Sequence, residues 1–363
     1  MITSSDDPHT AQVIAIVREA SVGRAEETEV LGLGALAHVA DSPRTLSTKV
    51  DGPDAAFRWV ARSGGTVVVT VMTLVGLFLL VRGFQALQVA GPNFITEQSW
   101  DPNSKKFGIA AVFSGTVFIA LTAIFFALPL AFGTGLYISE YAPQKIKGLL
   151  ITIVDLMAAI PSIVYGLWGF FFLSPLILPL SQWLATYFGW FPPFSVKGFD
   201  PNDPLATPTI FSASTFIAGI VVALMVAPIT SSIMREVFTQ APIGEREGAL
   251  ALGATKWGMI RSVVLPFGRG GIIGGTMLGL GRSLGETIAV FLIISPVFEI
   301  QPRILEKGGN SISALIALRY NEASGFEISA LMAAGLALFV VTLIVNFGAS
   351  TIVARSRSGS QSD

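Results

Sequence analysis

The sequence predicts an all-α membrane protein with six transmembrane helices, and three observations support this fold class. Only 13% of the 363 residues are charged and 52% are hydrophobic, whereas a soluble protein has roughly 25% charged residues. Glycine is frequent, with 37 residues, as is common in membrane helices. The few charges are nearly absent from six long apolar segments, and each segment approaches the ~20 residues needed to cross a bilayer core.

The six apolar segments follow one another along the chain, and charged residues occur in only two of them. They cover residues 64–81, 109–138, 149–173, 210–233, 270–295 and 328–354. The third contains Asp155, which we expect near a helix end or paired with a cation, and the fifth contains Arg282 and Glu286. The segments are too long for strands and do not alternate apolar and polar residues, so a β-barrel is excluded. Six such segments are rare among buried helices of a soluble core, so we assign them as spans.

The segments outside the spans define the expected domain organisation. Residues 1–60 are assigned to a polar cytoplasmic N-terminal tail, residues 61–356 to the transmembrane domain and residues 357–363 to a short cytoplasmic tail. The N-terminal tail lacks the apolar core of a secretory signal. Residues 174–209 are rich in proline and aromatic residues, and we expect them to form a capped, partly interfacial outer loop.

Orientation follows from lysine and arginine near the span ends. These residues are dense before span one and after spans two, four and six, which lie on one side of the membrane if there are six spans. The opposite loops contain fewer for their length. We therefore predict that both termini are cytoplasmic.

The cytoplasmic loop between spans four and five, about residues 235–270, contains the most informative motif. Residues 247–252 are mostly helix formers, and Gly253 suits a helix end because glycine accepts positive φ. A second amphipathic segment begins near Trp257, and Pro266 is expected to end it. The pattern predicts two short helices on the cytoplasmic face, suited to a groove in a partner protein. An ordinary amphipathic connector is the alternative.

This loop resembles the EAA coupling loop of ABC importer permeases. The resemblance rests on Glu247, Ala249, Gly253, Leu265 and Pro266 at the family's spacing. Gly248 replaces the usual second alanine and Val263 the common isoleucine. The resemblance implies that these residues, together with Ala254, couple the chain to an ATPase.

Three further segments resemble the phosphate importer permeases, the C type (PstC) more than the A type (PstA). They are residues 139–143 (SEYAP), 160–166 (IPSIVYG) and 279–290 (GLGRSLGETIAV). The resemblance covers about residues 64–363 and implies a type I, MetI-like permease fold in a bacterial inner membrane. It implies as partners a second permease (PstA-like), an ATPase homodimer (PstB-like) that carries ATP and magnesium, and an outside phosphate-binding protein (PstS-like). No cofactor is expected in this chain.

Arg282 and Glu286 are the candidate translocation residues. Four residues apart, they are expected to share a helix face and to form a pair inside the membrane. A charge there costs about 2.5–3.5 kcal/mol and usually faces a bundle interior or a water-filled path. Arginine also suits phosphate, because its planar fork gives two parallel hydrogen bonds. A purely structural pair between two helices is the alternative.

The phosphate permease resemblance supports a transport role for this pair and adds Ser162 to the path. Ser283 and Thr287 flank the pair as hydroxyl donors, although such groups in spans often bond their own helix. Glycines four apart in residues 270–285 are interpreted as packing surfaces. They are not a phosphate cradle, since the chain has no P-loop motif.

Composition narrows the function classes. The chain has no cysteine, and its two histidines, His9 and His38, lie in the N-terminal tail. No catalytic nucleophile with a base, and no metal-ligand cluster, is apparent. The expected function is the permease subunit of an ATP-driven phosphate importer that works by alternating access. The alternatives are an importer of another oxyanion (sulfate, molybdate or phosphonate) and an ATP-independent secondary transporter.

Overall fold

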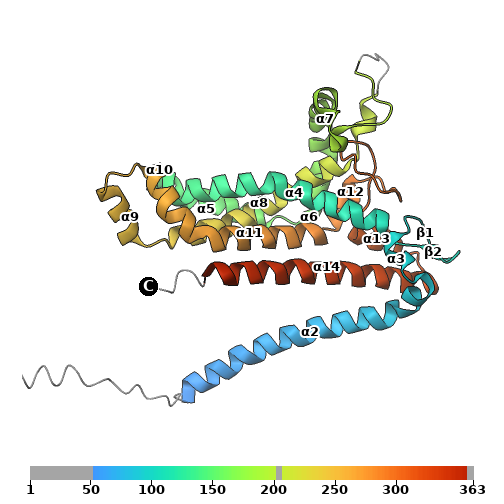
Figure 1. The fold of residues 1–363 in the computed structure, drawn as a ribbon, viewed down its shortest axis with the longest axis horizontal. Coiled ribbons are helices and arrows are strands. Elements are labelled where there is room, and N and C mark those ends of the chain that lie inside the picture. The colour runs from blue at the N-terminus through green and yellow to red at the C-terminus, as the bar shows by residue number, and fades with distance from the viewer. Residues whose placement is uncertain (1–51, 202–206, 358–363) are drawn as a thin grey trace, which may run out of the picture. The chain divides into compact units, whose positions relative to one another are not determined.

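The computed structural model describes residues 52–201 and 207–357, and within these ranges it is almost entirely helical (Figure 1). Six helical segments in the described part are long and apolar enough to cross a membrane: Gly52–Ala90, Ala110–Tyr141, Ser162–Phe188, Thr215–Thr239, Lys256–Gly285 and Phe326–Gly348. The prediction of an all-α membrane protein with six spans is therefore confirmed.

The chain divides into two compact units, Met1–Thr70 and Val71–Asp363. Of the first unit, the structure describes only the beginning of helix α2 (Gly52–Ala90). This helix starts before the expected domain boundary at residue 61. The other residues of the expected N-terminal tail, 1–51, and residues 358–363 lie outside the described residues.

In the second unit, the last part of α2 packs antiparallel to α14 (Phe326–Arg357). The hydroxyl of Ser329 donates to the Arg82 carbonyl at 2.7 Å and accepts from the Ala86 N–H at 3.3 Å. A methyl group built on Gly83 would lie 2.8 Å from the backbone nitrogen of Ala333. Small residues thus let these two helices approach closely, as is common between membrane helices.

The centre of the second unit is formed by α4 (Ala110–Leu136), α8 (Thr215–Thr239) and α11 (Leu265–Gly285). Helix α8 is the most buried of them and contacts both others along its length. Methyl groups built on Gly271 and Gly279 would come within 2.8 Å of α8 side chains. The interpretation of these α11 glycines as a packing surface is confirmed.

The third span expected at residues 149–173 is broken where Pro161 follows Ile160, and the apolar segment that can cross the membrane is Ser162–Phe188 instead. Helix α5 (Gln144–Ala159) ends there, and α6 (Ser162–Trp168) continues into the π-helical segment η2 (Gly169–Leu173). Proline lacks an N–H and disfavours the helical conformation of the preceding residue, and Ile160 is accordingly extended, with ψ 129°.

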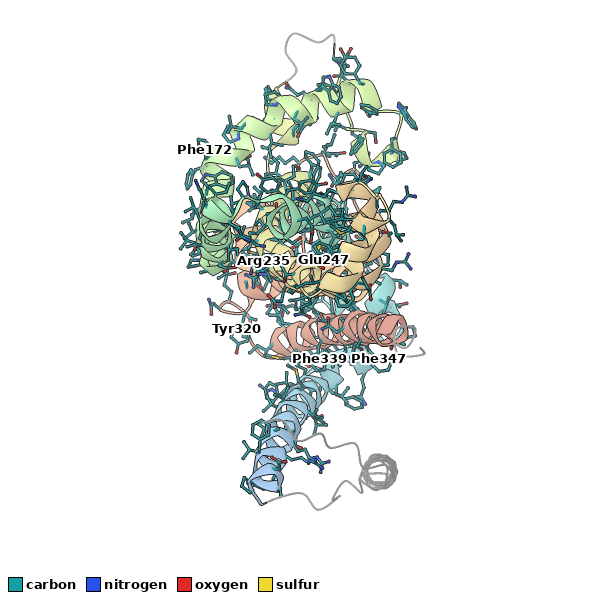
Figure 2. The ribbon with its side chains drawn as sticks, turned by 90° about the vertical axis from the view of Figure 1, so that its left-hand side faces the viewer. Phe172, Arg235, Glu247, Tyr320, Phe339 and Phe347 are labelled. Atoms are coloured by element: carbon teal, nitrogen blue, oxygen red, sulfur yellow. The ribbon has the colours of Figure 1, made fainter. Side chains whose placement is uncertain are left out.

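Helix α7 (Ser174–Phe188) corrects the expected outer loop at residues 174–209, because its first part is helical. Figures 1 and 2 show α7 running across the direction of α4 and α11 rather than along it. Its charge-free apolar composition, including Leu176, Leu180 and Trp183, sustains the helix beyond the span that the sequence outlined. Pro179 lies inside it.

The fifth span is also broken, after Gly285, and the short helix α12 (Ile288–Ile293) follows. The continuous helix expected over residues 270–295 is therefore wrong. Helix α12 packs against α6, and a methyl group built on Gly166 would lie 2.9 Å from the Ala289 Cα. The two broken spans thus meet through their half-helices.

Short elements cover the opposite end of the bundle from the loop at residues 235–270 (Figure 1). They are α3 (Asn93–Thr96), the antiparallel strands β1 (Trp100–Asp101) and β2 (Lys106–Phe107), the 3₁₀ turns η3 (Pro192–Phe194) and η4 (Pro208–Phe211), and α13 (Ile312–Arg319). Phe216 donates its backbone N–H to Ile304 at 2.9 Å, which ties this cover to α8. Beside β1, the N–H and hydroxyl of Ser99 bind the Glu97 carboxylate and hold the pKa of Glu97 below its usual value.

Candidate functional site

The loop between spans four and five forms two short helices joined by a tight turn. Helix α9 (Ile243–Ala251) ends in a Schellman motif, in which the N–H of Ala254 bonds the Ala249 carbonyl at 3.1 Å and the N–H of Gly253 bonds the Leu250 carbonyl at 2.9 Å. Gly253 has φ +86°, as its position in the sequence predicts. Helix α10 (Lys256–Met259) then begins, with the Thr255 hydroxyl accepting from the Gly258 N–H.

The expectation that Pro266 ends the second helix is wrong. Helix α10 continues through the π-helical segment η5 (Ile260–Val264) into α11, and Pro266 lies in the first turn of α11. The N–H of Leu265 bonds the Ile260 carbonyl five residues back. The wider turn changes the hydrogen-bond register just before the proline, so the helix accommodates a residue without an N–H.

The outer surface of the loop is accessible in this chain. Glu247 is exposed and lies on the near face in Figure 2, which views the bundle from the end that carries α9. Apolar side chains accompany it: Leu252 is 91% exposed and Ile243 72% exposed. Ala249 instead packs against the bundle end. A small projecting helix with exposed apolar tips and a carboxylate is suited to a groove in a partner protein.

Two residues that the sequence did not single out hold this loop against the bundle. Arg246 of α9 pairs with Glu140 at 3.1 Å and also donates to the Phe238 carbonyl. Glu140 lies in the π-helical segment η1 (Tyr137–Tyr141), which extends α4. The two residues are separated by 106 positions, so no local spacing reveals the pair.

Asp155 behaves as the sequence indicated. It lies near the end of α5, 3.9 Å from the Arg235 guanidinium of α8, and accepts a hydrogen bond from Ser232 at 3.0 Å. The Asp155 side chain is 54% exposed, so this contact contributes little stability. It marks where α5 meets the end of α8.

Arg282 and Glu286 do not share a helix, because α11 ends between them and Glu286 has an extended backbone with ψ 124°. No ion pair joins them in the described part of the chain. The Glu286 carboxylate instead accepts the Ala289 N–H at 3.3 Å and so caps α12, and the Glu286 carbonyl accepts the Ser313 hydroxyl at 2.7 Å. Glu286 therefore organises the helix break, and the expected direct pairing is wrong.

Arg282 is left exposed in this chain, in the last turn of α11, where the helix dipole favours a cation. The hydroxyl of Tyr165, in α6, bridges the neighbouring break by donating to the Met157 carbonyl at 2.9 Å. The half-helices α6 and α12, which follow the two breaks, pack against each other, and Arg282 lies one turn before the second break. Broken spans and intramembrane charges are typical of transport pathways.

The hydroxyl groups assigned to the path differ in availability. Ser283 is buried and donates to the Leu280 carbonyl at 2.9 Å, and Thr287 donates to the Gly285 carbonyl at 3.2 Å. Both therefore follow the common pattern of bonding their own backbone. Ser162 is half-buried at the first position of α6.

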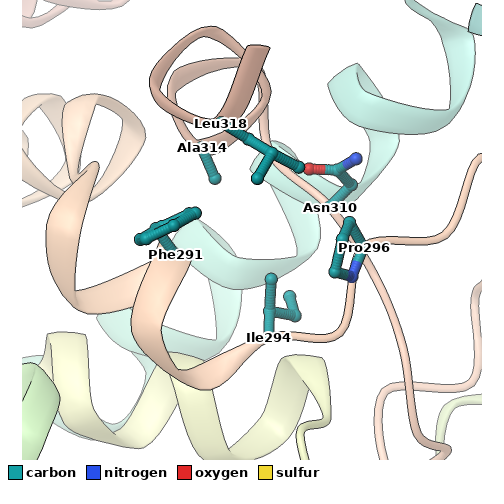
Figure 3. Close-up of a pocket in the computed structure, with 6 residues that line it drawn as sticks. All are labelled: Phe291, Ile294, Pro296, Asn310, Ala314 and Leu318. Atoms are coloured by element: carbon teal, nitrogen blue, oxygen red, sulfur yellow. The ribbon is translucent and has the colours of Figure 1, made fainter. Parts of the chain in front are cut away.

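A small cavity of about 60 Å³ lies beside α12 and α13 (Figure 3). Its lining is apolar except for one amide: Phe291, Ile294, Pro296, Asn310, Ala314 and Leu318. Ligand pockets usually measure about 300–1,000 Å³ and contain several placed polar groups. We therefore do not assign this cavity as an anion site.

Comparison with known proteins places this geometry in a family context. The family model described as "Binding-protein-dependent transport system inner membrane component" matches residues 127–358. A "Phosphate transport system permease protein PstC 2" of Mycobacterium tuberculosis is 38% identical over 84% of this chain and 92% of its own length. The "Phosphate transport system permease protein PstC" of Pasteurella multocida is 36% identical over 80% of this chain and 88% of its own length.

A solved structure with the same fold comes from a bacterial ABC transporter involved in the import of the acidic polysaccharide alginate. Its TM-score is 0.51 at 19% identity, and the match covers 83% of this chain and 99% of that chain. At this identity the similarity concerns the fold alone.

Proposed function

The chain belongs to the family of binding-protein-dependent transport system inner membrane components, and from this premise we propose that it is the permease of an ATP-driven phosphate importer. The assignment of phosphate as the substrate rests on the 38% identity, over 84% of the chain, with a phosphate transport system permease. The six apolar helices agree with a multi-pass membrane protein. The chain would form half of a path that opens to one side at a time.

Coupling to ATP hydrolysis is assigned to α9 and the turn after it. The exposed carboxylate of Glu247 and the exposed apolar side chain of Leu252 would enter a groove of the partner ATPase. Gly253, Ala254 and Ala249 would hold this knob in shape through the Schellman motif. Leu265 and Pro266 would join the knob to α11 and so to the path.

Phosphate passage is assigned to the region of the two helix breaks. Arg282 supports this role because its guanidinium is exposed and free of an ion pair with Glu286. A permanently charged planar fork binds phosphate oxygens well, yet a path must also release the anion. Glu286 would fix the break rather than neutralise Arg282 directly. Ser283 and Thr287 lie beside these residues in sequence, and Ser162 lies at the other break, at the first position of α6.

The proposed assembly contains a second permease, an ATPase dimer that binds ATP and magnesium, and a phosphate-binding protein outside the membrane. The positive-inside distribution supports a cytoplasmic position for α9 and for both termini. The end of α14 lies at the same end of the bundle as α9 (Figure 1), which supports this orientation for the C-terminus. The membrane would be a bacterial inner membrane.

Reconstitution into liposomes tests the function. The permease would be co-expressed with its neighbouring subunits, purified as a complex and supplied with ATP on the α9 side and phosphate with its binding protein on the other. We expect ATP-dependent phosphate uptake that excess sulfate does not reduce. Equal uptake of both anions would refute the substrate, and uptake by the chain alone without ATP would refute the mechanism.

A further inference from the structure

The π-helical segment η1 at the end of α4 receives one cation from each of three neighbouring elements. Lys147 of α5 donates to the Ser139 carbonyl at 3.3 Å, Arg246 of α9 pairs with Glu140 at 3.1 Å, and Lys256 of α10 lies 4.7 Å from the centre of the Tyr141 ring. Three consecutive residues of one five-residue segment therefore contact both helices of the loop and the start of α5.

The contact between Arg246 and Glu140 is the most buried of the three. The Glu140 side chain is 4% exposed and that of Arg246 is 19% exposed. The same guanidinium donates to the Phe238 carbonyl in the last turn of α8, where carbonyls lack partners within the helix. Arg246 thus joins α9 to both α4 and α8.

Helix α9 has little else to hold it. None of its residues is fully buried, and among its described polar side chains only Arg246 makes a hydrogen bond or an ion pair. The half-buried Ala249 adds a small apolar contact. Apart from its connections to α8 and α10 and its packing on η5, α9 is therefore held to the bundle through the contacts of Arg246.

The other end of the same rod reaches the second helix break. Helix α4 and η1 form one continuous segment, Ala110–Tyr141. Near its outer end, the Thr116 hydroxyl accepts the Ile312 N–H at 3.0 Å. The adjoining Ser313 donates to the Glu286 carbonyl at 2.7 Å. A continuous series of contacts therefore leads from Arg246 through Glu140 and α4 to the break beside Arg282.

We propose that the Arg246–Glu140 ion pair is a positioning pair that passes the movement of α9 to α4, and through α4 to the helix break at Glu286. This inference rests on the proposed function, because it presumes that an ATPase moves α9. The Arg246–Glu140 pair would therefore transmit movement, although it lies outside the exposed surface of α9 that docks the ATPase. Loss of the pair would leave the ATPase bound but separate its cycle from the opening of the path.

The test measures phosphate transported per ATP hydrolysed by the complete complex in liposomes, and separately the affinity of the ATPase for the permease. We expect Glu140→Gln and Arg246→Gln each to lower the transport ratio at least tenfold while the affinity changes less than about twofold. The reciprocal exchange, Glu140→Arg with Arg246→Glu, should recover a large part of the ratio. Glu245→Gln is the matched control, since this neighbouring carboxylate is exposed.

A covalent replacement keeps the proposal testable if the exchange misfolds. The chain has no cysteine, so the double variant Glu140→Cys with Arg246→Cys carries the only two thiols. A short bis-methanethiosulfonate reagent would join them, and a reducing agent would release them. With the two thiols cross-linked, we expect ATP hydrolysis to drive phosphate transport; after reduction of the cross-link, we expect ATP hydrolysis without transport. Equal coupling in both states would overturn the proposal.

The outcomes separate this inference from the proposed function. A wild-type complex that accumulates no phosphate with ATP would refute the proposed function. A wild-type complex that couples, with single variants that couple equally well, would refute only the transmission role. Single variants that lose ATPase binding in proportion to transport would also refute it, because the pair would then only shape the docking surface.

Discussion

A Gly→Ala substitution is expected to have opposite effects on stability inside α9 and in the turn that follows it. Gly253 has φ +86°, a conformation that costs an L-residue about 1–2 kcal/mol. Gly248 lies inside α9, is exposed and has nothing within 4 Å of a built methyl group. Alanine there stabilises the helix by roughly 0.8–1.0 kcal/mol. Gly253→Ala should therefore weaken the coupling knob, and Gly248→Ala should strengthen it.

These energies translate into measurable affinities. If the formed turn is the conformation that binds the ATPase, 1–2 kcal/mol lowers the ratio of formed to unformed turn roughly 5- to 30-fold. The apparent Kd for the ATPase should rise by up to that factor in Gly253→Ala and stay equal or fall in Gly248→Ala. Hydrogen exchange of the Gly253 and Ala254 amides, which close the Schellman motif, reports the turn directly. Faster exchange is expected only in Gly253→Ala.

A change of affinity in the same direction in both alanine variants would refute the role of the turn in docking. Faster amide exchange in Gly253→Ala without any loss of ATPase affinity would also refute it, because the turn would then be irrelevant to docking. An unchanged exchange rate would show that the positive φ carries no cost at this turn.

Further predictions concern the other assigned residues. Glu247→Lys should insert normally but lose ATPase binding and uptake, measured by pull-down and phosphate flux; normal uptake would reject the docking role. Arg282→Gln should abolish phosphate flux with assembly intact, whereas Arg282→Lys should retain part of it; full flux in Arg282→Gln would favour a structural role. Gly166→Val should lower thermal stability by about 1–3 kcal/mol, because the half-helices α6 and α12 touch there; an unchanged melting temperature would contradict this. Because the pKa of Glu97 is lowered in the folded chain, its carboxylate contributes to folding stability above the usual pKa of glutamate. That contribution is lost as the pH falls through the lowered pKa. Ser99→Ala removes the hydroxyl bond but keeps the N–H bond, so it should move that loss to higher pH in an isotope-edited infrared titration; an unmoved titration would exclude the Ser99 hydroxyl as a cause.

The number and approximate positions of the spans could be predicted from the sequence, because the bilayer imposes a simple requirement for length and hydrophobicity. The turn at Gly253 could also be predicted, because positive φ has a clear residue preference. The breaks were harder. Pro161 gives a local signal for the first break, but the Glu286 break depends on contacts with Ala289 and with Ser313 of another segment.

The candidate site could likewise be predicted only in part. Helical spacing brought Arg282 and Glu286 to attention but wrongly joined them, because the spacing argument presumes an unbroken helix. The pair between Glu140 and Arg246 depends on the packing of η1 against α9. Charges separated so widely in sequence acquire a partner only once the bundle has formed.

The π-helical segment η5 has a geometric consequence for the whole second half of the chain. Helices α10 and α11 form one rod, Lys256–Gly285, with η5 as its only described π turn. Each residue of an α-helix advances the azimuth by about 100° and the axis by about 1.5 Å. A π turn takes up one extra residue in almost the same rotation as an α turn, so the same residues wound as an uninterrupted α-helix would turn Arg282 by roughly 100° relative to Trp257. The π turn therefore sets the rotational phase between the two ends of this rod to which the proposed functions are assigned.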